Sequence, residues 1–131
     1  MKTRMVVLLI VAGIFVVGAT SYAHHSFGAT YDLKKQITIE GKLVQVMLRN
    51  PHSFFHVEAP NESGQMQRWS VEGGGATQMR TEGDKGLQVG DTIKVVVNPA
   101  RSAEAHRGRL ISITRPADGW TWGGRAGQVV D

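Results

Sequence analysis

Residues 36–48, with the sequence QITIEGKLVQVML, form the stretch that decides the fold. Ile37 and Ile39 alternate with polar residues before Gly41, and apolar and polar residues alternate again after it. A period of two residues places successive side chains on opposite faces of an extended chain, so this stretch predicts one long β-strand. Glycine inside a strand pattern indicates a bulge or a bend, which we expect at Gly41.

Four further stretches carry a strand pattern, and turn signals rich in Pro, Gly and Asn separate them. The predicted strands are residues 53–59, 67–72, 92–97 and 109–114, and a short helix is expected at residues 76–82. Five strands with little helix predict a mainly β protein, a small five-stranded OB-like barrel, with a small β-sandwich as the alternative. The glycine run at residues 73–75 lacks the Lys and Ser/Thr of a phosphate-binding loop and is expected to be a flexible connection.

Residues 1–23 have the order of segments that is typical of a cleavable signal peptide. Lys2 and Arg4 precede an apolar run, and Ser21 and Ala23 place small residues at positions −3 and −1 of a cleavage site. The run is shorter than the ~20 residues of a membrane-spanning helix, and an uncleaved amino-terminal anchor is the alternative. We therefore expect a periplasmic or secreted protein whose single β-barrel domain spans residues 24–131, with a tail containing Gly and Trp from about residue 115.

Composition excludes several classes of site and partner. The chain has no cysteine, which excludes disulfides, zinc–thiolate sites and thiol nucleophiles. Removal of Lys2 and Arg4 with the leader lowers the formal net charge from +4 to +2, and the remaining basic residues are scattered. We therefore expect no nucleic-acid partner, and no membrane contact unless the leader is retained. No nucleophile elbow surrounds a serine, so binding is expected rather than catalysis.

The histidines are the main candidates for chemistry. Cleavage after Ala23 would make His24 the first residue, and its amine and ring nitrogen together can chelate one metal ion. One further imidazole would complete the nitrogen-only set that suits Cu(II), so copper is the expected cofactor. The predicted metal ligands are His24, His25 and His52, with His56 and His106 as weaker candidates.

The histidines also have structural alternatives to metal binding. Each histidine could be structural instead: His52 could cap the turn after Pro51, His56 could face solvent on a strand, and His106 could lie exposed in a loop.

The function expected is copper handling or delivery, with a periplasmic protein as the possible partner. The alternative is a non-metal binding module for a small molecule, a glycan or a partner protein, and a copper oxidase or monooxygenase ranks last. The aromatic platform of such a module would consist of Trp69, Trp120 and Trp122.

Several motifs also have a familiar arrangement. They are His24-His25-Ser26-Phe27, Tyr31-Asp32, Ile39-Glu40-Gly41-Lys42-Leu43, Asn50-Pro51-His52, the strand of Trp69, and Leu87-Gln88-Val89-Gly90-Asp91. Together they resemble a family of small exported bacterial proteins of unknown function, which share a signal peptide, His-His-Ser-Phe and a central Asn-Pro-His. The resemblance implies an exported, mostly β domain and brings no established activity. Members tend to carry a clearer helix ending in Arg-Arg-Gly-Trp between the third and fourth strands, and residues 75–83 depart from that pattern.

Overall fold

The computed structural model describes residues 27–80 and 86–123, and the chain divides into two compact units. The first unit spans residues 1–30, of which residues 27–30 are described and helical. The second unit spans residues 31–131. The predicted leader, His24 and His25 lie outside the described residues, so cleavage after Ala23 stays a prediction. Within the two described ranges, no helix is long and apolar enough to span a bilayer.

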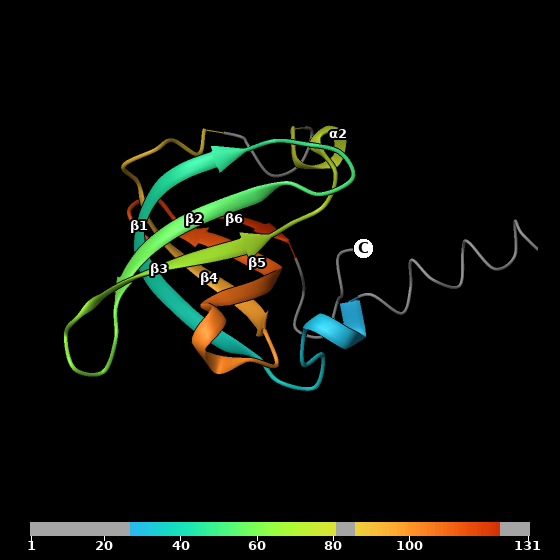
Figure 1. Cartoon of the computed structure of the whole chain (residues 1–131). Coiled ribbons are helices and arrows are strands. Elements are labelled where there is room, and N and C mark those ends of the chain that lie inside the picture. The colour runs from blue at the N-terminus through green and yellow to red at the C-terminus, as the bar shows by residue number, and fades with distance from the viewer. Residues whose placement is uncertain (1–26, 81–85, 124–131) are drawn as a thin grey trace, which may run out of the picture. The chain divides into compact units, whose positions relative to one another are not determined.

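The second unit is a closed β-barrel with one added strand. Its elements are β1 (Ile37–Met47), β2 (Phe54–Pro60), β3 (Met66–Glu72), α2 (Ala76–Gln78), β4 (Thr92–Pro99), the 3-10 turn η2 (Ala103–Ala105), β5 (Arg107–Arg115) and β6 (Trp120–Gly123). The sheet order is β3-β2-β1-β4-β5-β6, and β3 also pairs with β5. That extra pairing closes the first five strands into a ring (Figure 1). The predicted five-stranded OB-like barrel is thus confirmed over the β-sandwich.

β1 forms the bend that lets one strand serve two parts of the barrel. It pairs with β4 over residues 37–42 and with β2 over residues 42–47, and Figure 1 shows it as a long curved strand. The bulge lies between Leu43 and Gln45 rather than at Gly41. Gly41 has a different role, because a Cβ there would collide with the carbonyl oxygen of Glu58 on β2. Glycine at this position therefore permits the close approach of two backbones.

The core fills the inside of the barrel and follows the alternation of the strands. On β4, Ile93, Val95 and Val97 have no exposed surface, whereas the intervening residues point outward. On β2 the same alternation buries Phe55 and Val57, which share one face of the strand. The buried cluster comprises Ile39, Leu43, Phe55, Val57, Ala59, Val71, Met79, Ile93, Val95, Val97, Leu110, Ile113 and Trp122.

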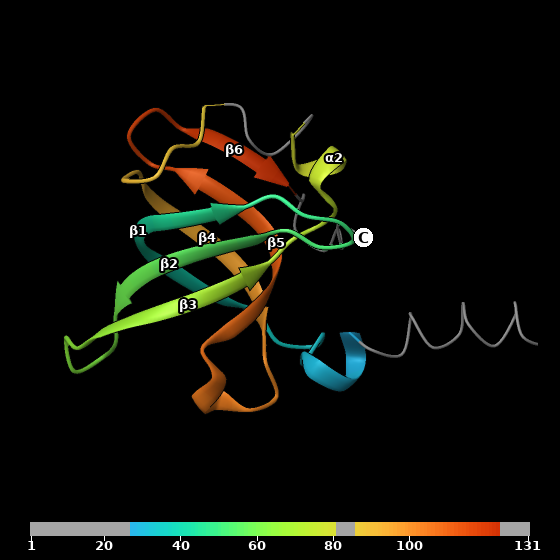
Figure 2. The same cartoon turned by 45° about the horizontal axis from the view of Figure 1, so that its top comes forward.

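Two segments differ from the expectation. β6 pairs with the end of β5 (Figure 2) and adds a strand that the sequence did not indicate, and its Trp122 is 5% exposed. The helix expected at residues 76–82 is an α-helix only at Ala76–Gln78, and it is followed by the fully buried Met79. Residues 81–85 lie outside the described ranges.

Candidate functional site

A buried carboxylate at the end of β3 meets donors from three distant parts of the chain. Glu72 is 8% exposed. Its Oε2 accepts a hydrogen bond from the hydroxyl of Tyr31, and its Oε1 lies 2.7 Å from Nδ1 of His52. Nη2 of Arg107 lies 3.5 Å from Oε2 and 3.4 Å from the oxygen of Tyr31. We call these four residues the Glu72 cluster.

Closure of the barrel assembles part of this cluster. Val71 points into the core, so the alternation of β3 places Glu72 on the outer face. The parallel pairing of β3 with the first residues of β5 brings Arg107 to the end of β3. Tyr31 arrives from the lead-in to β1, which a β-bridge to Ala100 holds in place, and it is 1% exposed.

The turn that carries His52 is fastened to the segment after β3. The backbone of Ser53 exchanges two hydrogen bonds with residues 73 and 74, at 2.8 and 2.9 Å. The amide nitrogen of Ala76 donates to Oδ1 of Asn50 at 2.9 Å. The glycine run, which was expected to be a flexible connection, is therefore one side of a hydrogen-bonded latch that positions His52.

The surroundings of Tyr31 keep it a neutral donor. Burial, and then the hydrogen bond to Glu72, raise the pKa of Tyr31 well above its usual value. The phenol therefore keeps its proton throughout the physiological range. Tyr31 and Arg107 both approach Oε2 of the carboxylate, while Oε1 faces the imidazole of His52.

The contact with Glu72 orients the ring of His52. A neutral imidazole that donates through Nδ1 carries its lone pair on Nε2. Metal-binding histidines commonly donate their second ring nitrogen to a carboxylate in this way, which fixes the tautomer and raises the basicity of the ligand. The side chain of His52 is 34% exposed. Nε2 is therefore the nitrogen with which His52 could bind a metal ion.

The other described histidines have different surroundings. His56 lies on β2, where burial, and secondly the charge of Arg68, lower its pKa. His106 has a positive φ of 42° and packs against Trp69, with the ring centroids 5.3 Å apart and the planes at 74°. In the part of the chain that the structure describes, no three His, Asp or Glu side chains are grouped so that they could hold a metal ion.

Three members of the Glu72 cluster, Tyr31, Glu72 and Arg107, were not among the predicted site residues, although Tyr31 belongs to one of the motifs that carry the family resemblance. Tyr31 and Arg107 are 41 and 35 positions from Glu72, so no local spacing connects them. A glutamate at the end of a strand ordinarily faces water, and here only the closure of the barrel and the lead-in cover it. His52 is the one member that its sequence pattern identified.

Comparisons with known proteins give a family and a fold. The model of a family of unknown function, DUF6152, matches residues 12–109. No curated protein matches the chain. Among solved structures, the mitochondrial single-stranded DNA-binding protein Rim1 of S. cerevisiae is similar, with a TM-score of 0.50 and 12% sequence identity. The match covers 69% of this chain and 96% of that chain, and at this identity it shows the fold alone.

Proposed function

The chain belongs to the family of unknown function DUF6152, and because membership brings no activity, we propose from its own residues that it is an exported copper-binding protein. In this proposal His52 binds Cu(II) through Nε2. His24 supplies the terminal amine and its ring, and His25 supplies a further imidazole. The protein would carry copper in the periplasm and pass it to a protein partner.

The observation that carries this proposal is the 2.7 Å contact between Nδ1 of His52 and Oε1 of Glu72. A histidine that only capped its turn would need no buried carboxylate behind its ring. Here the hydrogen bond from the amide of Ala76 to Asn50 fixes the backbone of the turn, and Glu72 fixes the imidazole. The ring of His52 is therefore oriented before a metal ion binds. Such preorganisation strengthens binding because less freedom is lost when the metal binds.

The remaining proposed ligands belong to the predicted mature amino terminus. His24 becomes a chelating residue only if cleavage after Ala23 exposes its amine. Its nitrogen donors, with an imidazole from elsewhere, make a set suited to the square-planar preference of Cu(II). The binding of the metal requires deprotonated ligands, and ordinary imidazoles titrate at about pH 6.5. We therefore expect copper affinity to fall as the pH is lowered from 7 to 5.

Nucleic acid is not part of this proposal, although the fold is shared with a single-stranded DNA-binding protein. Nucleic-acid binding draws most of its affinity from clustered Lys and Arg contacts with phosphates. Without the leader, the net charge is low and the basic residues are scattered along the sequence. We expect no measurable retention on single-stranded DNA at physiological salt.

The proposal is tested by Cu(II) titration, against a competing chelator, of protein that has been exported and purified without an amino-terminal tag. His52→Ala should weaken binding by at least about tenfold, and Glu72→Gln by about 10- to 100-fold. His106→Ala is the matched control and should bind as the wild type does. Circular dichroism establishes that each variant is folded. Unchanged affinity in folded His52→Ala would contradict the proposal.

A further inference from the structure

We propose that a cavity beside the β2–β3 hairpin binds one ring of a neutral pyranose sugar, independently of copper. The cavity has a volume of about 320 Å³. It lies between residues 37–40 at the start of β1 and residues 59–62, where β2 ends and the turn of the hairpin begins. Gln67 and Trp69 of β3 complete its lining. We call it the hairpin cavity.

The hairpin cavity exists because β1 and β2 pair over only part of their length. Their ladder begins at Lys42, which lies opposite Glu58. The next equivalent pair would need a backbone N–H at Pro60, and proline has none. Over residues 37–41, β1 follows β4 instead and separates from the hairpin (Figure 1). The edge of β1 that faces the hairpin is therefore left without a paired strand in this part of the described structure.

The backbone of Thr38 presents a donor and an acceptor on this unpaired edge. In a strand, the N–H and C=O groups of successive residues point alternately to the two sides. Leu43 turns both of its groups toward the loop before β4, because it donates to the carbonyl of Asp91 at 2.9 Å and accepts from the amide of Gly90 at 2.7 Å. The pairing with β4 is regular over residues 37–42, so Thr38, five residues before Leu43, points its groups to the opposite side, toward the hairpin cavity. No ladder or turn hydrogen bond from the described residues meets them there.

Two side-chain amides add further donors and acceptors. Asn61 lines the cavity, and its Oδ1 accepts the backbone amides of Ser63 and Gln65 at 2.9 Å each. Those two bonds fix the amide of Asn61, so its Nδ2 is the group left to donate to a ligand. The side chain of Gln67 makes no hydrogen bond with the part of the chain that the structure describes, and it offers both a donor and an acceptor.

The charges around the hairpin cavity favour a neutral ligand that carries hydroxyl groups. Glu40 and Glu62 line it, and none of its lining residues is basic. Glu40 already pairs with Lys94, at 3.1 Å. The carboxylate of Glu62 would repel an anion, but it can accept a hydrogen bond from a hydroxyl. Because each sugar hydroxyl both donates and accepts, a sugar can satisfy the backbone of Thr38, the two amides and this carboxylate together.

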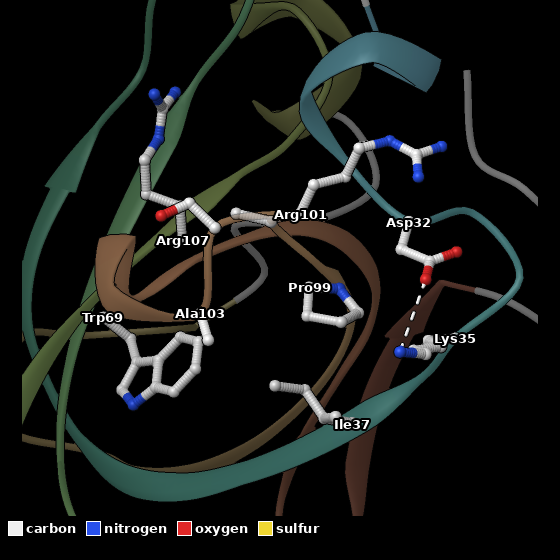
Figure 3. Close-up of a pocket in the computed structure, with 10 residues that line it drawn as sticks. Asp32, Lys35, Ile37, Trp69, Pro99, Arg101, Ala103 and Arg107 are labelled. Carbon is white, nitrogen blue, oxygen red and sulfur yellow. Dashed lines mark ion pairs between the residues drawn. The ribbon is translucent and has the colours of Figure 1, made fainter.

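The apolar side of the hairpin cavity provides a flat surface for the ring of a sugar. Trp69 supplies this surface, and the contact with His106 at 5.3 Å between ring centroids fixes the plane of the indole. Figure 3 shows Trp69 next to Ile37 at a second cavity, of about 240 Å³, which both residues also line. The face of an indole is weakly negative and the C–H bonds on the face of a pyranose are weakly positive, so the two stack.

The volume of the hairpin cavity limits the ligand to one sugar ring. A dry cavity of about 150 Å³ can hold benzene, and a hexose has about twice as many heavy atoms, so it needs roughly 300 Å³. The hairpin cavity, at about 320 Å³, accommodates one hexose. A single ring held by a few hydrogen bonds binds weakly, and we expect a dissociation constant of about 1 mM.

Three probes test this proposal in the copper-free protein: methyl β-D-glucopyranoside, sorbitol, which has hydroxyls but no ring, and cyclohexylmethanol, which has a ring without the hydroxyls. Their binding is followed by ¹H–¹⁵N spectra. The glucoside should bind most tightly and shift the indole signal of Trp69, the side-chain amide of Gln67 and the backbone amide of Thr38. The indole signals of Trp120 and Trp122, which do not line the cavity, should stay in place.

A pair of variants tests the polar contacts. Gln67→Leu keeps the size of the side chain and removes its amide, so it should weaken the glucoside by about two- to tenfold. Gln88→Leu is the matched control, because Gln88 is exposed in the turn before β4 and does not line the cavity. It should bind the glucoside as the wild type does.

Three results would overturn the proposal. The first is a glucoside that binds no more tightly than sorbitol or cyclohexylmethanol at these signals. The second is undiminished binding of the glucoside to folded Gln67→Leu. The third is tighter binding of an extended peptide, acetyl-Val-Thr-Val-Thr-amide, at the amide of Thr38, which would show that the free edge accepts a β-strand instead of a sugar. None of these results depends on copper, so the proposal for His52 stands or falls on its own measurement.

Discussion

At the scale of single residues, Glu72 is the acceptor that positions the side chains of its three neighbours. It is one of few buried charged residues in the described part of the chain, and its two oxygens receive Tyr31, His52 and Arg107. A buried carboxylate is costly unless donors satisfy it, and here a phenol, an imidazole and a guanidinium contact it. The cluster therefore stabilises the fold as well as orienting one imidazole.

The free energy of unfolding should show how much the contacts of Tyr31 and Glu72 each stabilise the fold. Tyr31→Phe removes one hydrogen bond to a charged acceptor and should lower the free energy of unfolding by about 1–3 kcal/mol. Glu72→Gln keeps the size of the side chain but presents an amide to three donors, so it should cost more than Tyr31→Phe. Urea unfolding followed by tryptophan fluorescence measures both. If the free energies of unfolding of both variants stayed within about 0.5 kcal/mol of the wild type, the cluster would not stabilise the fold.

His56 predicts a dependence of stability on pH. Its pKa is lowered in the folded state, first by burial and then by the charge of Arg68, so the unfolded chain takes up its proton more readily. The stability linked to this residue is complete above the unfolded pKa of ~6.5 and is lost as the pH falls through that value toward the folded pKa.

His56→Gln should therefore lose less stability than the wild type between pH 7.5 and pH 5, as measured by urea unfolding at each pH. Arg68→Gln should reduce the pH dependence without removing it, because burial is the larger cause. A steeper loss in His56→Gln than in the wild type would show that the sign is wrong.

At the scale of elements, the sequence predicted the strands that alternate strongly and missed the one that does not. The alternation in β1, β2 and β4 is a local property, because each residue's face follows from a period of two. β6 is only four residues long, and Trp120 and Trp122 could equally belong to an irregular tail. What makes it a strand is the turn after Arg115, whose guanidinium binds both carboxylate oxygens of Asp118 at 3.0 and 2.8 Å.

Trp122 should make β6 necessary for the stability of the barrel. It is 5% exposed and belongs to the core cluster, whereas Trp120 is only partly buried. Trp122→Ala should lower the free energy of unfolding by about 3–5 kcal/mol, as for other large-to-small changes in a core. Trp120→Ala is the matched control and should cost less. Similar losses in thermal or urea unfolding would mean that β6 does not seal the core as the structure indicates.

At the scale of the whole molecule, the barrel was predictable and the Glu72 cluster was not. Five alternating strands with short turns suffice to indicate an OB-like barrel, because burying their apolar faces in a small domain favours closure. The cluster depends on which strands meet at that closure, namely β3 with β5, and on the β-bridge between Tyr31 and Ala100, the residue that follows β4. Those contacts join residues distant in sequence, so only His52, in a turn with its own strong signal, could be identified beforehand.

Copper binding, as proposed, also depends on the whole chain. It needs His24 and His25 at the predicted mature terminus and His52, whose ring Glu72 orients. The most direct test is pulsed electron paramagnetic resonance of the Cu(II) complex of the exported, untagged protein, after its intact mass has established the first residue. We expect a chain beginning at His24, a nitrogen-rich axial spectrum, and the loss of one coupled imidazole in His52→Ala. A spectrum identical in the wild type and His52→Ala would contradict the assignment of His52 as a ligand, and with it the central claim.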